Sequence, residues 1–170
     1  MQVFRSLSDV DDGFGPSAIT IGKFDGVHAG HRAIIGRLET TAKARSLTSV
    51  VVTFDRNPLA LLRPELCPES LVSNEQKLEL LSETGVDATL ILAFDTDLSA
   101  QSPRDFVTSI LVDALDTRAV LAGSDFRFGA GGAGTMATLG ELGREFGFDV
   151  LTMDDIRPSD DRRASSSWIR

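Results

Sequence analysis

Apolar runs and polar stretches alternate along the chain with a regular spacing. Five runs of aliphatic and β-branched residues predict strands, over Ala18–Ile21, Val50–Phe54, Ala88–Ala93, Ala119–Ala122 and Asp149–Met153. Most of these runs are continuously apolar and do not alternate with polar residues. Such continuity is expected where helices cover both faces of a sheet.

Amphipathic stretches lie between the predicted strands. Residues 30–45 carry apolar side chains at helical spacing. Ser73-Asn74-Glu75-Gln76 is a capping box, and Ser102-Pro103 places proline at a first helical position. A further helix is predicted over Thr135–Phe146, ended by Gly147. Strands that alternate with helices predict an α/β fold with a mainly parallel sheet.

The composition is that of an ordinary globular domain. The chain has 170 residues, of which 42% are hydrophobic and 25% charged. This length fits one domain. No apolar run approaches the roughly 20 residues that span a bilayer, and the N-terminus lacks the apolar core of a signal peptide. One cysteine, Cys67, excludes an intrachain disulfide, so a cytoplasmic location is the default expectation.

The net charge of −8 limits the kinds of molecule that we expect the chain to bind. It argues against binding nucleic acid through bulk positive charge. A phosphorylated small molecule can still be bound through backbone N–H groups and a few local cations. We therefore expect small-molecule substrates, with no nucleic acid or membrane partner, and the sequence does not predict an oligomeric state.

The segment Gly22-Lys23-Phe24-Asp25-Gly26-Val27-His28-Ala29-Gly30-His31 holds both histidines of the chain, three residues apart. It lies at a predicted strand-to-helix turn, where unpaired N–H groups and the helix dipole favour a phosphate. Histidines at such a position can donate hydrogen bonds to phosphate oxygens as charge builds in a transition state. Two ordinary capping or surface histidines are the alternative, and a metal site is disfavoured because no third ligand is evident.

The longer pattern Gly-x-Phe-Asp-Gly-x-His-x-Gly-His resembles the signature of the FMN adenylyltransferase module of bacterial bifunctional riboflavin kinase/FAD synthetases. Its last four residues resemble the His-x-Gly-His motif of the wider nucleotidyltransferase superfamily. Residues 51–58, 123–129 and 165–170 resemble further segments of the same family, in the same order. The resemblance covers essentially the whole chain.

This resemblance implies one nucleotidyltransferase domain over residues 1–170, with a Rossmann-like open parallel sheet of about five strands and helices on both faces. The riboflavin kinase domain that usually follows in the family is absent from these residues. The implied substrates are ATP and FMN, joined by in-line attack to give FAD and pyrophosphate. Mg²⁺ is expected to be bound through the substrate phosphates, and no metal ligand is assigned in the chain.

The resemblance also assigns roles to individual residues. The expected catalytic residues are His28, His31 and Arg170. The expected ATP-binding residues are Gly22, Phe24, Asp25, His28, Gly30, His31, Ser165, Ser166, Ser167 and Arg170. The expected FMN-binding residues are Phe54, Asn57, Asp125, Phe126 and Phe128.

Several alternatives stay open at this point. Asp25 could shape its turn or place magnesium or a histidine, and Arg127 could contact a phosphate or lie in solvent. Phe126 and Phe128 could pack in the core instead of against a flavin. The chain could use another phosphorylated acceptor, or bind flavin nucleotides with little turnover. A dinucleotide-dependent oxidoreductase is disfavoured, because the first turn lacks the Gly-x-Gly-x-x-Gly pattern.

Overall fold

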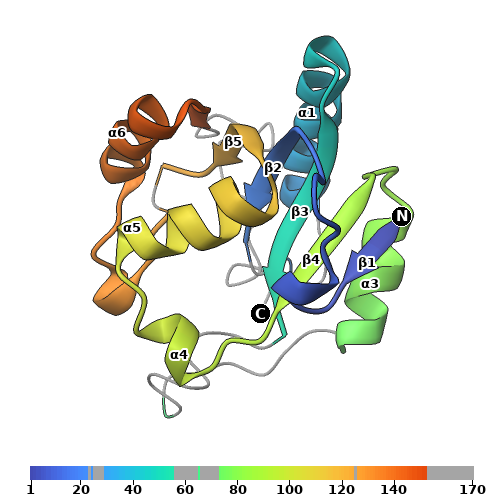
Figure 1. Ribbon diagram of the computed structural model, residues 1–170. Helices are drawn as coiled ribbons and strands as arrows, with labels where there is room; N and C mark the ends of the chain where they lie inside the picture. The colour runs from blue at the N-terminus through green and yellow to red at the C-terminus, as the bar shows by residue number, and fades with distance from the viewer. Residues whose placement is uncertain (23, 25–28, 56–64, 66–72, 125, 153–170) are drawn as a thin grey trace, which may run out of the picture.

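The computed structural model describes residues 1–22, 24, 29–55, 65, 73–124 and 126–152. Within them, six parallel strands form one sheet in the order β1-β4-β3-β2-β5-β6 (Figure 1). The strands are β1 (Gln2–Phe4), β2 (Ser17–Ile21), β3 (Thr48–Phe54), β4 (Ala88–Leu92), β5 (Thr117–Ala122) and β6 (Asp149–Thr152). The prediction of an α/β fold with an open parallel sheet is confirmed.

All five predicted strands are present, and β1 is an addition that the pattern did not predict. β1 has only three residues and pairs with β4, with Val3 opposite Thr89. Val3 remains 38% exposed, so β1 lacks the buried apolar run by which the other strands were recognised. Its strand conformation depends on pairing with β4, which lies far away in the sequence.

Helices cover both faces of the sheet (Figure 1). Alternate residues of each strand point to opposite faces, so Val50 and Val52 of β3 join one apolar cluster and Val51 joins the other. The cluster with Val51 includes side chains of α1 (Ala29–Arg45) and α3 (Asn74–Ser82). The cluster with Val50 includes side chains of α5 (Pro103–Phe106), η3 (Val107–Ala114) and α6 (Met136–Phe146).

The helix starts follow the predicted capping signals. The Ser73 hydroxyl accepts from Gln76 N–H at 3.1 Å, and the Gln76 side chain accepts from Ser73 N–H at 2.9 Å, which completes the capping box of α3. Ser102 caps α5, with Pro103 in its first turn. α6 begins after the cap Thr135, and Gly147 ends it with a left-handed φ of 91°.

Two features between β4 and β5 were not predicted. A short helix, α4 (Thr96–Ser99), directly follows the end of β4 and is capped by the Asp95 carboxylate. Beyond Phe106, α5 continues as the π-helical segment η3. Two 3₁₀ turns, η1 (Leu7–Asp9) and η4 (Ala130–Gly132), complete the described elements.

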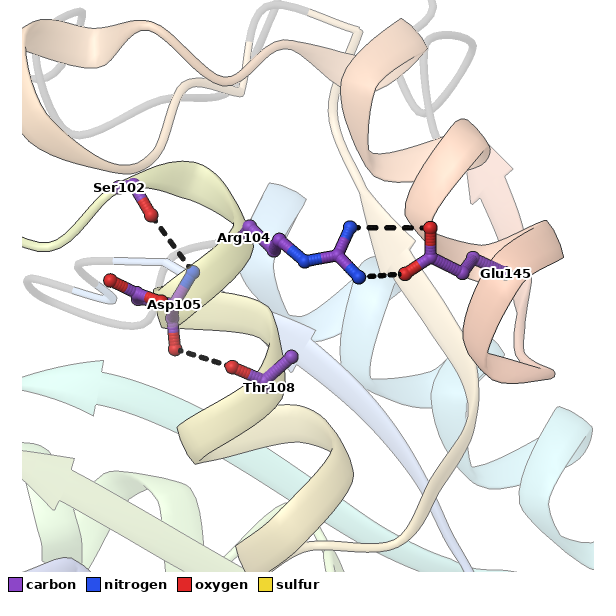
Figure 2. A network of polar contacts seen from close by, with 5 residues as sticks. All are labelled: Ser102, Arg104, Asp105, Thr108 and Glu145. Carbon is purple, nitrogen blue, oxygen red and sulfur yellow. Dashed lines mark hydrogen bonds and ion pairs between the residues drawn. The ribbon is translucent and has the colours of Figure 1, made fainter.

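Arg104 joins α5 to α6. Its guanidinium donates to both carboxylate oxygens of Glu145, as Figure 2 shows, and it lies 5.2 Å from the centroid of the Phe146 ring. The hydrogen bond from Arg104 and the charge of Glu145 raise the pKa of the arginine above its ordinary value. In the same view Thr108 donates to the Asp105 carbonyl at 3.2 Å, within the α5–η3 segment. Since Arg104 and Glu145 are both largely exposed to solvent, their ion pair contributes little to stability.

Candidate active site

The direction of strand addition reverses next to β2. From β2 the chain adds β3 and then β4 on one side, and it later places β5 and β6 on the other side. In open parallel sheets, ligands bind beyond the carboxyl ends of the strands at such a reversal. The segments that begin at Gly22, after β2, and at Gly123, after β5, therefore flank the expected ligand position. Both segments had been singled out for their chemistry.

Phe24, which closely follows the end of β2, has its ring in the core. Phe24 is 2% exposed and packs in the cluster below α1, with a left-handed φ of 52° that a phenylalanine rarely adopts. A Cβ on Gly22 would lie 3.0 Å from the Phe24 ring, so the glycine leaves room for it. Backbone strain held by surrounding packing is a feature of functional turns. The structure thus places Phe24 in the core, and its expected role in ATP binding stays a prediction.

The helix α1 begins with the segment that carries the histidine motif. Gly30 and His31 lie in its first turn, where backbone N–H groups have no partner inside the helix. That first turn contains no acidic residue. Its N–H groups and dipole therefore favour an anion beyond the carboxyl end of β2. We call residues 22–31 the phosphate-side turn.

A pocket of about 200 Å³ lies near the carboxyl ends of β3 and β4. Ten residues line it: Phe54, Phe94, Leu98, Ser99, Phe106, Phe126, Arg127, Phe128, Gly129 and Gly132. Five of them are phenylalanines, so its chemistry is aromatic with few polar groups. We call this set of residues the aromatic pocket.

The rings of the aromatic pocket pack against one another in defined geometries. Phe126 and Phe128 are stacked, with centroids 5.7 Å apart and planes inclined by 12°. Phe106 is tilted against Phe128 at 5.6 Å. Phe54 and Phe94 meet edge to face at 5.5 Å. These contacts hold the rings in fixed orientations, which favours a planar ligand over a flexible chain.

Three residues expected to bind FMN, namely Phe54, Phe126 and Phe128, meet in the aromatic pocket. Phe128 is 5% exposed and belongs to the apolar core, and Phe126 packs against that core. The two interpretations of these rings are therefore compatible, since Phe128 both fills the core and lines the pocket. Their role in FMN binding stays a prediction.

The residues expected to bind FMN include three of the ten lining residues. Phe94 follows the end of β4, Leu98 lies in α4 and Phe106 lies in α5, and none of the three was expected at a site. Phe94 could have been found from its place just beyond the end of a strand. Arg127 donates to the Gly132 carbonyl at 3.4 Å and is the cation among the lining residues.

Other expected site residues lie outside the described residues. These are Asp25, His28, Asn57, Asp125, Ser165, Ser166, Ser167 and Arg170. The described part of the chain contains no group of three or more His, Cys, Asp or Glu side chains that could hold a metal ion. In that same part, no helix combines the length and the apolarity needed to cross a membrane.

Residues 13–167 match the model of a family described as FAD synthetase. The chain belongs to this family. A bifunctional riboflavin kinase/FMN adenylyltransferase of Escherichia coli K12 is 39% identical over 134 residues, which is 79% of this chain and 43% of that protein. The Pseudomonas fluorescens protein of the same description is 36% identical over 170 residues, covering 100% of this chain and 54% of that protein. The chain thus spans about half the length of these FAD synthetase relatives.

Solved structures support the fold of this FAD synthetase family member. A Streptococcus pneumoniae protein described as a macrolide-efflux protein superposes with a TM-score of 0.81 at 21% identity, over 98% of this chain and 53% of that chain. A pantoate-beta-alanine ligase of Francisella tularensis superposes with a TM-score of 0.63 at 12% identity, over 98% of this chain and 71% of the ligase. At these identities the likeness concerns the fold alone.

Proposed function

We propose that the chain transfers the AMP group of ATP to the phosphate of FMN, forming FAD and releasing pyrophosphate. The observation that carries this proposal is the aromatic pocket, which brings Phe54, Phe126 and Phe128 together at the carboxyl edge of the sheet. The aligned relatives, which are bifunctional riboflavin kinase/FMN adenylyltransferases, support the same reaction.

The pocket suits the ring system of a flavin. Its volume of about 200 Å³ is below the roughly 300–1,000 Å³ of sites that enclose a whole drug-sized ligand. A planar aromatic ring would enter it and leave the ribityl phosphate outside. Stacking against fixed phenylalanine rings stabilises a bound acceptor that is rigid and planar more than one that is flexible and polar. This argument favours FMN over a phosphopantetheine-like acceptor.

The proposed chemistry is a single displacement at phosphorus. An oxygen of the FMN phosphate attacks the α-phosphorus of ATP while the bond to the bridging oxygen of pyrophosphate breaks in line. The new bond is the phosphoanhydride of FAD, and no covalent enzyme intermediate is needed. Positioning and charge stabilisation account for catalysis of this kind.

The roles proposed for individual residues follow the motifs of the chain. His28 and His31, with the N–H groups at the start of α1, would donate hydrogen bonds to the ATP phosphates as negative charge builds. Ser165, Ser166, Ser167 and Arg170 would hold the β- and γ-phosphates through hydroxyls and a bidentate guanidinium. Magnesium, whose preferred oxygen ligands the ATP phosphates supply, would offset part of the phosphate charge when bound.

One assay tests the proposal. The protein is incubated with ATP, Mg²⁺ and FMN, FAD is followed by chromatography, and pyrophosphate release is measured in parallel. We expect FAD and pyrophosphate in equal amounts, together with quenching of flavin fluorescence when FMN binds. Quenching without turnover would indicate a flavin-binding module instead of an enzyme. No quenching, but pyrophosphate release with another phosphorylated acceptor, would replace FMN while keeping nucleotidyl transfer.

A further inference from the structure

A buried ammonium lies beneath the carboxyl end of β3. Lys77 of α3 is 5% exposed, although lysine is almost never buried without partners. Its Nζ donates to the Phe54 carbonyl at 3.0 Å and lies 3.5 Å from the Thr53 hydroxyl. The lysine therefore holds the backbone of a residue whose ring lines the aromatic pocket.

The next residue of the chain is held from the same helix. Asn74, one turn before Lys77 on α3, donates from Nδ2 to the Asp55 carbonyl at 2.8 Å. The Asp55 N–H donates to the Leu92 carbonyl at 2.8 Å, which continues the pairing of β3 with β4 by one residue. Two consecutive carbonyls at the end of β3 are thus fixed by two side chains of one helix.

The side chain of Asp55 extends this network to β4. Its Oδ1 accepts from the Phe94 N–H at 2.9 Å. Phe94 is the partner of Phe54 in the edge-to-face pair, with ring centroids 5.5 Å apart. The carboxylate therefore fixes one member of that pair, and Lys77 fixes the other.

We propose that Asp55, Asn74 and Lys77 are positioning residues that set the Phe54–Phe94 wall of the aromatic pocket for the acceptor. We call these three residues the β3 clamp. They touch backbone groups of the wall and are not themselves lining residues of the pocket. Asn57, which is expected to bind FMN, follows Asp55 by two residues in the sequence. The inference rests on the proposed function, because it names the acceptor as the ligand whose binding depends on the clamp.

The sharpest test uses Asp55, because its exposed side chain can be changed with little risk to folding. Asp55→Ala removes the acceptor for the Phe94 N–H, and Asp55→Asn keeps an oxygen there. We expect Asp55→Ala to weaken FMN binding about fivefold to tenfold, the effect of one lost hydrogen bond, and to leave ATP binding within twofold. Asp55→Asn should recover most of the loss. Both dissociation constants are measured by fluorescence or calorimetry.

Lys77→Met gives a second, independent variant. It keeps the length of the side chain but removes the donor, so it leaves the Phe54 carbonyl without that bond. FMN binding should weaken at least tenfold, measured well below the unfolding temperature of the variant. Lys43→Met on the exposed part of α1 is the matched control, and it should bind FMN and ATP as the parent protein does.

A readout that needs no ligand separates this inference from the proposed function. Hydrogen exchange at the Phe94 amide and the ring-proton resonances of Phe54 and Phe94 should change in Asp55→Ala and Lys77→Met but not in Lys43→Met. If the parent protein does not bind FMN, the proposed function fails and these resonances alone decide whether the clamp sets the wall. Unchanged resonances, or FMN binding within twofold of the parent in Asp55→Ala, would overturn the inference.

Discussion

The two halves of the candidate active site are assembled in opposite ways. The phosphate-side turn is one continuous segment of the sequence, which includes Gly22, the buried Phe24 and the start of α1. The aromatic pocket gathers side chains from β3, the β4–α4 connection, α5 and the loop after β5. The first half presents backbone N–H groups at the start of α1, and the second presents aromatic side chains.

This contrast predicts that the two halves tolerate substitutions differently. Backbone N–H groups at a helix start survive most substitutions, so in the phosphate-side turn we expect the histidines to make the largest side-chain contribution to turnover. In the aromatic pocket each ring is oriented by another ring, so a change at one position spreads to its neighbours. Substitutions in the first half should therefore change turnover, and substitutions in the second should change acceptor affinity.

The largest effect is expected from the histidines. In the proposed mechanism His31→Ala and His28→Ala each remove a hydrogen-bond donor to the ATP phosphates, and each should lower kcat by about 10²–10³-fold. FMN affinity should remain within about twofold, because neither residue belongs to the aromatic pocket. Steady-state kinetics with FAD detection measures the first quantity and flavin fluorescence measures the second. A histidine variant that loses FMN affinity but keeps its kcat would contradict the expectation that the phosphate-side turn affects turnover and the aromatic pocket affects acceptor affinity.

Phe126→Ala is the matching change in the aromatic pocket. Phe126 is only partly buried, yet it stacks on Phe128, so its loss removes a ligand surface without emptying the core. We expect FMN affinity to fall about tenfold, within the range of a lost aromatic contact, while the dissociation constant of ATP stays within twofold. Equal losses of ATP and FMN affinity would contradict the proposal that the aromatic pocket binds FMN separately from the ATP site.

Gly134→Ala should have a smaller effect on the same pocket. A Cβ at this position would lie 2.7–2.9 Å from atoms of the Phe128 ring, so the ring has to move. We expect FMN affinity to fall about threefold to fivefold, with stability lowered by about 1–2 kcal/mol as in other overpacked sites. Gly140→Ala is the control, since nothing lies within 4 Å of its Cβ and the helix gains up to about 1 kcal/mol. FMN titration and urea unfolding measure both variants.

Local patterns predicted most of the fold because they report burial and capping. The apolar run over residues 50–54 lies in the central strand β3, and the capping box at Ser73 lies at the start of α3. Local patterns did not predict the strand β1, because its conformation depends on pairing with β4, which is distant in the sequence. Local patterns also did not predict the π-helical form of η3, because its apolar residues are equally compatible with an α-helix.

The candidate site was predicted unevenly for the same physical reason. The histidine motif is local, so its residue types and spacing can be recognised in the sequence. The aromatic pocket is not local: Phe94 and Phe106 join Phe54 and Phe128 only after β3, β4 and β5 have been assembled into one sheet. Nothing in the sequence around Phe106 separates a pocket residue from a core residue. The β3 clamp is hidden in the same way, since Lys77 occupies a helical position that would usually be solvated.

Glu39 offers a test of stability away from both halves of the site. Its Oε1 is buried with no hydrogen-bond partner in the described structure, beside Gly85 at the opposite, amino edge of the sheet. Burial raises the pKa of Glu39 above the ordinary value of 4.5, Lys43 lowers it, and Asp87 raises it further. Because the folded-state pKa lies above that of the unfolded chain, the folded state holds the proton more tightly. This contribution to stability is therefore present at low pH and is lost as pH rises above 4.5.

Glu39→Gln removes this cost of ionisation and gives the smallest expected effect. The variant should be slightly more stable than the parent at pH 7, because solvent screens much of the charge of Glu39, and the difference should shrink below pH 4.5, where the parent carries a neutral Glu39 in both states. Urea unfolding at the two pH values measures it, with Glu79→Gln on the exposed side of α3 as the control. A variant less stable than the parent at pH 7 would mean that the attraction of Lys43 outweighs burial. FMN and ATP affinities should stay unchanged, because Glu39 belongs to neither the phosphate-side turn nor the aromatic pocket.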